Sequence, residues 1–244
     1  KDLSSYDEIA IDLETKDPEL KTMGSGSVTG RGKIVGIALA VDGWSAYYPI
    51  DHEGGGNMDK KKVMDYFRTI LNYPSRKIFH NAMYDVCFIR AAGLKINGEV
   101  VDTMIAGSLV NENRFRYDLG SMGRDYLGKG KNEAVLTETA KEWGIDPKSE
   151  MYKLPAMYVG EYAEQDAKLT LELWQEMKKQ ILIEEVSSIF ELETELFPCL
   201  VDMRFLGVRV DTEAAYKLKQ KLVTEEKECL QKVKKETGVD TQIW

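Results

Sequence analysis

The fold is decided by an alternating stretch near the start of the chain, Tyr6-Asp7-Glu8-Ile9-Ala10-Ile11-Asp12-Leu13-Glu14. Apolar residues recur there with a period of two, which is typical of a β-strand that buries one face. The odd-numbered residues from Ile9 to Leu13 share one face of this predicted strand. The even-numbered residues Ala10, Asp12 and Glu14 share the other, so two carboxylates project from the same side.

After this strand the chain continues as an antiparallel meander. Strands are predicted at 33–41 and 45–50, and the Asp42-Gly43 pair between them is a strong hairpin signal because both residues tolerate positive φ. Residues 16–32 interrupt the meander with a polar loop that contains several glycines and serines.

Beyond residue 57 helices alternate with short strands. The pattern predicts a helix at 58–71, a buried strand at 77–80, a helix at 82–92 that ends at Gly93, and a further strand at 100–101. The rest of the chain to about residue 183 reads as mostly helical. A meander followed by alternating helices and strands indicates an α/β fold with a mixed sheet flanked by helices.

The pattern changes near residue 187. A helix is predicted at 189–205, followed by a turn at Gly207 and a long charged helix that runs from an N-cap at Asp211 to about Thr237. The apolar face of that last helix has few partners within the chain. We therefore predict two domains, 1–187 and 188–244, the second of which is a helical extension.

The composition limits the kinds of site this chain can build. Its two histidines and three widely spaced cysteines give little material for zinc clusters or disulfide frameworks and favour a cytosol-like compartment. Any bound metal must then be held by carboxylates. The net charge of −8 speaks against nucleic acid as a partner, but bound cations would reverse the sign locally. No apolar run is long enough to span a membrane, and a chain that opens at Lys1 rather than Met is expected to be a fragment.

Three short segments carry side chains suited to chemistry. Besides the carboxylate pair on the first strand, Asn81 and Asp85 lie four positions apart where a short strand turns into a helix. Tyr162 and Asp166 lie four positions apart in a helical pattern, so they stack on one helix face. Each segment alone is more often a solvated surface or an ordinary helix start. Their occurrence together, in order along the chain, indicates a common acidic cleft.

A cluster of four carboxylates suits the hydrolysis of a phosphodiester. Without metal the carboxylates would repel one another and raise one another's pKa. Two divalent ions about 3.5–4 Å apart can activate water, neutralise the transition state and stabilise the leaving oxygen. Because Mg²⁺ and Mn²⁺ prefer oxygen ligands, the cluster indicates a site for two such cations, with a neighbouring tyrosine to orient the water.

The three segments resemble the three exonuclease motifs of the DEDD superfamily, which are 3′→5′ nucleases with a ribonuclease-H-like fold. The matching stretches are Ile11-Asp12-Leu13-Glu14-Thr15, His80-Asn81-Ala82-Met83-Tyr84-Asp85 and Tyr162-Ala163-Glu164-Gln165-Asp166. A tyrosine four positions before the last aspartate is typical of the tyrosine branch. The resemblance implies a mixed five-stranded sheet flanked by helices, with a helical C-terminal extension.

Other segments are similar to the family A DNA polymerases, that is, bacterial DNA polymerase I and its phage relatives. They comprise residues 34–38, 101–106 and 126–128, and a tail from Glu193 to Asp211 that resembles the start of the polymerase thumb. The runs at 48–52 and 54–57 favour a phage-like member. No segment resembles the polymerase palm, so this chain is not expected to polymerise DNA.

The resemblance also implies roles for individual residues. The implied ligands of two divalent cations, Mg²⁺ or Mn²⁺, are Asp12, Glu14, Asp85 and Asp166. Tyr162 would orient the attacking water together with Glu14. The residues implied to contact the terminal nucleotides are Asn81, His80 and Tyr84. Asp102 is expected to cap the helix that follows it rather than to bind metal.

The implied activity is hydrolysis of the 3′-terminal phosphodiester of single-stranded DNA, which releases 5′-mononucleotides. In a parent polymerase this would be proofreading, with the thumb, palm and fingers as partners, in a bacterial cytoplasm or in the host cytoplasm if the protein comes from a phage. Two alternatives stay open: an exoribonuclease resembling ribonuclease D, and a catalytically silent scaffold that binds nucleic acid. The thumb-like tail speaks against the first, and the intact acidic residues speak against the second.

Overall fold

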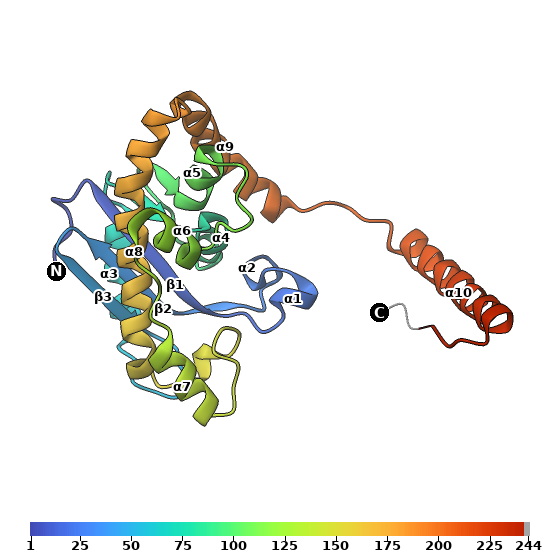
Figure 1. Ribbon diagram of the computed structural model, residues 1–244. Coiled ribbons are helices and arrows are strands. Elements are labelled where there is room, and N and C mark those ends of the chain that lie inside the picture. The colour runs from blue at the N-terminus through green and yellow to red at the C-terminus, as the bar shows by residue number, and fades with distance from the viewer. Residues whose placement is uncertain (242–244) are drawn as a thin grey trace. The chain divides into compact units, whose positions relative to one another are not determined.

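A five-stranded sheet forms the centre of the structure, a computed structural model that describes residues 1–241 (Figure 1). Its strands are β1 (Glu8–Lys16), β2 (Lys33–Val41), β3 (Trp44–Pro49), β4 (Arg76–Phe79) and β5 (Val100–Asp102). They lie in the order β3-β2-β1-β4-β5. The first three strands are antiparallel, whereas β4 runs parallel to both β1 and β5. The predicted mixed sheet is confirmed, and β1 is its middle strand.

Helices surround the sheet and follow the predicted order. They are α3 (Lys60–Leu71), α4 (Ala82–Ala91), α5 (Thr103–Val110), α6 (Leu119–Leu127), α7 (Ala134–Glu142), α8 (Ala156–Ile183), α9 (Ser187–Leu206) and α10 (Thr212–Thr237), with a 3₁₀ turn at Met151–Lys153. The prediction that residues 16–32 form a loop is wrong in one respect. The segment contains two single-turn helices, α1 (Leu20–Met23) and α2 (Gly26–Thr29). The carboxylate of Asp17 accepts a hydrogen bond from the N–H of Gly26 and helps to order this segment.

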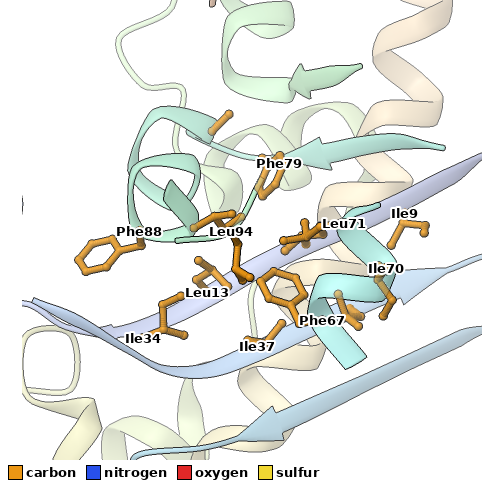
Figure 2. Close-up of a cluster of buried hydrophobic side chains, with 14 of the residues drawn as sticks. Ile9, Leu13, Ile34, Ile37, Phe67, Ile70, Leu71, Phe79, Phe88 and Leu94 are labelled. Carbon is orange, nitrogen blue, oxygen red and sulfur yellow. The ribbon is translucent and has the colours of Figure 1, made fainter. Parts of the chain in front are cut away.

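The two faces of β1 pack into different parts of the core. Ile9 and Leu13 contribute to a cluster with Phe67 of α3 and Phe88 of α4, as Figure 2 shows. Ala10, on the opposite face, belongs to a second cluster that includes residues of α5, α6 and α8. The predicted alternation of faces is therefore confirmed, and the carboxylates of β1 project toward the side that α8 covers.

Small residues on β2 leave room between the sheet and α8. Asp12 pairs across β1 and β2 with Ala38, and Ala38 pairs with Tyr47 on β3, so the three side chains share one face. The next β2 residue on that face is Gly36, where an added Cβ would lie 1.8 Å from the hydroxyl oxygen of Tyr47. Glycine at this position is therefore what allows the Tyr47 ring to extend toward β1.

The long helix α8 lies across the sheet (Figure 1) and is hydrogen-bonded to it at two places along its length. Near its start, the carboxylate of Glu164 accepts hydrogen bonds from the backbone N–H of Tyr47 and from the hydroxyl of Ser45, each at 3.2 Å. Farther along, the indole N–H of Trp174 donates to Glu8 of β1 at 2.9 Å. These contacts set which residues of α8 face the carboxylates of the sheet.

A buried carboxylate organises the start of two helices. Asp102 accepts hydrogen bonds from the backbone N–H groups of Asn81 (2.9 Å), Ala82 (2.7 Å) and Met104 (2.9 Å). It thus caps α5, as predicted, and it also holds the turn that begins α4. Since α4 carries Asp85, this cap helps to position a residue of the candidate site.

The chain divides into two compact units, residues 1–205 and the residues from 206 onward. The first unit contains nearly all of α9, so it extends past position 187, where the sequence pattern changes. In the second unit α10 begins at the predicted N-cap, Asp211, and has no buried residue. Its assignment to a polymerase thumb stays a prediction, and residues 242–244 lie outside the described part. None of the helices between residues 1 and 241 is long and apolar enough to cross a membrane.

Replacing Asp102 by alanine tests the double cap. Because three backbone N–H groups would lose their acceptor, we expect the free energy of unfolding to fall by about 3 kcal/mol. Asp59→Ala is the control, since Asp59 is an exposed cap that accepts one backbone bond, from Lys62, and should cost about 1 kcal/mol. Urea denaturation measures both values, and equal losses for the two variants would contradict a double cap.

Candidate active site

Asp85 is held beside β1 by a hydrogen bond to the backbone. The pairing of β4 with β1 extends only from Glu8 to Ala10. Beyond the end of that pairing, the N–H of Leu13 donates to Oδ1 of Asp85 at 3.0 Å. The second predicted motif therefore meets the first at the centre of the sheet, next to Asp12 and Glu14.

Asp166 approaches the same carboxylates from α8. Burial raises the pKa of Asp12 to about 7, and the charge of Asp166 adds to this rise. Burial likewise raises the pKa of Glu14, with further contributions from Asp12 and Asp166. The pKa of Asp85 is also raised, first by burial and then by Asp12, although its bond from Leu13 opposes the shift. The structure therefore brings the four predicted ligands into one electrostatically coupled cluster.

A lysine that sequence reasoning did not select reaches into this cluster. The ammonium group of Lys131 forms an ion pair with Oδ2 of Asp166 and donates to the hydroxyl of Tyr162 at 3.3 Å. Its charge also opposes the pKa rise of Asp12 and Glu14. Lys131 is thus the cation that partly compensates the carboxylates in this structure.

Tyr162 lies one helical turn before Asp166, as the sequence pattern predicts. Burial raises the pKa of its hydroxyl, and the charges of Asp166, Glu14 and Asp12 raise it further. The hydroxyl therefore keeps its proton at neutral pH and can donate a hydrogen bond to a group within the cluster.

The three predicted nucleotide contacts differ in their surroundings. Asn81 is exposed, adopts a left-handed conformation with φ 66°, and makes no side-chain bond to the helix it begins. Such backbone strain in a non-glycine residue is common at functional sites. Its amide is free to contact a ligand.

His80 and Tyr84 are more constrained. Burial and the charge of Lys131 lower the pKa of His80 to about 4, so its ring is neutral; Nδ1 contacts the Thr103 hydroxyl at 2.9 Å, and the buried Nε2 has no partner. The Tyr84 hydroxyl bonds to Thr15 at 2.8 Å and donates to Asp17 at 3.1 Å. Tyr84 therefore ties α4 to the residues after β1, and its contact with a nucleotide stays a prediction.

A tyrosine–histidine pair borders the cluster on the β3 side. The carbonyl of Leu154 can only accept, so Nδ1 of His52 donates to it at 3.1 Å. Nε2 of His52 is then left to accept from the Tyr47 hydroxyl at 2.5 Å. Burial raises the pKa of Tyr47, and the charges of Glu14 and Asp12 add to this rise. Neutral donors and acceptors thus line this side of the carboxylates.

The donor set fits a hard divalent cation, although the side chains do not yet form a ligand shell. Oδ1 of Asp166 is buried without a hydrogen-bond partner, which is unusual for a carboxylate oxygen and is expected of one that binds a cation. Within residues 1–241, however, no three His, Cys, Asp or Glu side chains converge closely enough to hold one ion in common.

Two residues of the site, Tyr47 and Lys131, were not selected from the sequence, and only the position of Tyr47 could have been predicted from it. A two-residue turn at Asp42-Gly43 pairs Ala38 with Tyr47, so the face of Tyr47 could have been predicted. By contrast, Lys129 and Lys131 occur in the same loop, and each directly follows a glycine. No local pattern shows that Lys131, and not Lys129, faces the cluster.

Comparisons with known proteins agree with these observations. A family profile described as 3′-5′ exonuclease matches residues 1–182. A DNA-directed DNA polymerase of Pseudomonas phage M6 is 34% identical over 237 residues, which are 94% of this chain and 35% of the polymerase. This chain therefore spans about a third of the length of that relative.

Two solved structures share the fold. The POL domain of Pol1 from M. smegmatis, in complex with DNA primer-template and dNTP, superposes with a TM-score of 0.66 at 15% identity, over 98% of this chain and 35% of that one. The exoribonuclease RNase D of Escherichia coli has a TM-score of 0.55 at 16% identity, over 84% of this chain and 47% of that one. Ribonuclease D is thus the more distant structural relation of the two. The chain belongs to the 3′–5′ exonuclease family found in family A DNA polymerases.

Proposed function

We propose that this chain hydrolyses the 3′-terminal phosphodiester of single-stranded DNA and releases 5′-mononucleotides. The observation that carries the proposal is the meeting of carboxylates from three distant segments at the centre of the sheet. Asp85 accepts a hydrogen bond from the N–H of Leu13 between Asp12 and Glu14, and the charge of Asp166 on α8 raises the pKa of both of those residues. Those segments coincide with the motifs of an exonuclease family that has polymerase relatives.

Exonucleases of this family depend on divalent metal ions. We assign the binding of two such ions, Mg²⁺ or Mn²⁺, to Asp12, Glu14, Asp85 and Asp166. When bound, the ions supply an activated water and neutralise the negative charge that develops on the phosphate and the leaving 3′ oxygen.

The protein's own groups orient the reactants. The protonated hydroxyl of Tyr162 can donate to the attacking water, and the carboxylate of Glu14 can accept a hydrogen bond from the same water, so that a lone pair faces the phosphorus. The exposed amide of Asn81 can hold the terminal nucleotide at the start of α4. The neutral ring of His80 lies next to it.

The wider context of this activity is part of the proposal. In a longer polymerase the domain would remove misincorporated nucleotides, with the thumb, palm and fingers as partners. Residues 188–244 would then belong to the beginning of the thumb. The location would be a bacterial cytoplasm, or the host cytoplasm for a phage protein.

Asp12→Ala tests the catalytic assignment. We expect the rate of 3′→5′ digestion to fall more than about 100-fold, since loss of groups that only support a metal ligand costs up to that factor. The fold should persist, because the change removes one of several repelling charges. Glu161→Ala is the control, since Glu161 is exposed on α8 next to Tyr162. Near-wild-type digestion by Asp12→Ala in saturating Mn²⁺ would contradict the assignment.

The pKa of Asp12 leads to a prediction about pH. This carboxyl binds its proton at a pKa of about 7 in the folded chain, against an ordinary aspartate value of 3.8. As the pH falls through about 7, the folded state takes up a proton that the unfolded state does not, so the metal-free protein should become more stable toward pH 5. Bound Mn²⁺ should remove this dependence by keeping the carboxylate ionised.

Thermal denaturation between pH 8 and pH 5, in EDTA and in Mn²⁺, measures the effect. In EDTA, Asp12→Asn should flatten the pH dependence relative to wild type. A thermal unfolding midpoint that falls on acidification and does not change with Mn²⁺ would argue against a metal site that includes Asp12.

The substrate class can be tested with DNA and RNA strands of one sequence. A site that binds deoxyribose closely would leave a ribose 2′-hydroxyl without a partner, at a cost of about 1–3 kcal/mol. We therefore expect RNA to be digested roughly 5-fold to 150-fold more slowly than DNA. Denaturing gels of 5′-labelled strands measure both rates. Faster digestion of RNA would favour an activity like that of ribonuclease D.

A further inference from the structure

The ion pair between Lys131 and Asp166 in the candidate metal site is more deeply buried than an ion pair of a surface lysine. The side chain of Lys131 is 20% exposed and that of its partner, Asp166, is 5% exposed. Among the other ion pairs of the described residues, no carboxylate partner is less than 17% exposed. A buried ion pair of this kind is unfavourable to break on one side, because the remaining charge would be left unpaired.

The charges of the cluster do not balance with Lys131 alone. The charges of Asp166, Asp12 and Glu14 act on the one ammonium group of Lys131, and Asp85 adds a fourth carboxylate that is coupled to Asp12 and Glu14. Two divalent ions would carry four positive charges and match the carboxylates, and the ammonium would then be surplus. Electrostatics therefore disfavours the simultaneous presence of the lysine and a full set of ions.

The two carboxylate oxygens of Asp166 differ in their partners. Oδ2 is engaged by Lys131, whereas Oδ1 is buried without a partner. The absence of any group of three metal-ligating side chains among residues 1–241 also fits a site in which one ligand is paired with an internal cation.

We propose that the ammonium group of Lys131 is a resident cation, which holds the carboxylate cluster in the metal-free protein and is released from Asp166 when divalent cations bind. Lys131 is thus a positioning residue that exchanges with metal. This inference rests on the proposed function, because it takes Asp166 as a metal ligand.

The loop around Lys131 is suited to such an exchange. Lys131 lies between α6 and α7, outside regular structure, and Gly130 comes directly before it. Gly128, two residues earlier, has φ 65°. Lys129, between these glycines, pairs with Glu172 of α8, and the two side chains are 59% and 31% exposed. Lys129 therefore provides a matched control in the same loop.

The first experiment compares the wild-type chain with Lys131→Met and Lys129→Met. Thermal midpoints are measured in EDTA and in saturating Mn²⁺, and Mn²⁺ binding is measured by calorimetry. In EDTA we expect Lys131→Met to unfold at a lower temperature, since its carboxylates lack a counter-charge. In Mn²⁺ this difference should close, and Lys129→Met should match wild type throughout.

The affinity for Mn²⁺ has an expected direction as well. Because the ion no longer displaces an ammonium group, Lys131→Met should bind Mn²⁺ roughly tenfold more tightly, the lower end of what one charge-assisted hydrogen bond contributes. If Lys131→Met is less stable than wild type by the same amount in EDTA and in Mn²⁺, the lysine is merely structural. Weaker Mn²⁺ binding by Lys131→Met would mean that the lysine assists the metal. Either result overturns the exchange.

The second experiment uses only wild type, so it does not depend on the folding of a variant. The acylation of lysine amines is followed by peptide mass spectrometry with and without Mn²⁺. We expect modification of Lys131 to speed up in Mn²⁺ while that of Lys129 stays constant, and an unchanged rate at Lys131 overturns the proposal. If wild type bound no Mn²⁺ at all, the metal-dependent function itself would fail; if it bound Mn²⁺ with Lys131 still protected, only the exchange would fail.

Discussion

Mutual repulsion among buried carboxylates is the constraint on which the rest of this structure depends. Asp12, Glu14, Asp85 and Asp166 are buried or partly buried, and burial raises the pKa of each. The charges of other members of the cluster raise the pKa of Asp12, Glu14 and Asp85 further. A fold that gathers such groups is less stable for it unless positive charge is supplied. In this chain the charge comes from Lys131, and in the function that we propose it comes from divalent cations.

The surrounding scaffold counters that repulsion with hydrogen bonds from the backbone. The N–H of Leu13 holds Asp85 where the pairing of β4 with β1 has ended. Asp102 in turn holds the first residues of α4, although it lies outside the cluster. The site therefore lies where the sheet changes from antiparallel to parallel pairing, a place where strand ends leave backbone groups free to bind side chains.

Neutral groups complete the lining of the site. Tyr162 and Tyr47 both keep their protons, and His52 accepts from Tyr47 because its other nitrogen donates to a carbonyl. Such groups can orient water or a phosphate oxygen without adding charge. Gly36 is what admits Tyr47 to this position, so a residue without a side chain contributes to the shape of the site.

The sequence by itself determined the strands, the hairpin and the three motif segments, because a period of two, a turn pair and fixed spacings are local properties. The face shared by Asp12 and Glu14 followed from the same period. Only the tertiary structure decided that Asp85 bonds to Leu13, that Tyr84 is engaged by Thr15 and Asp17, and that Lys131 rather than Lys129 meets Asp166. Those contacts join residues distant in the chain, and they depend on how helices pack on the sheet, which no local pattern encodes.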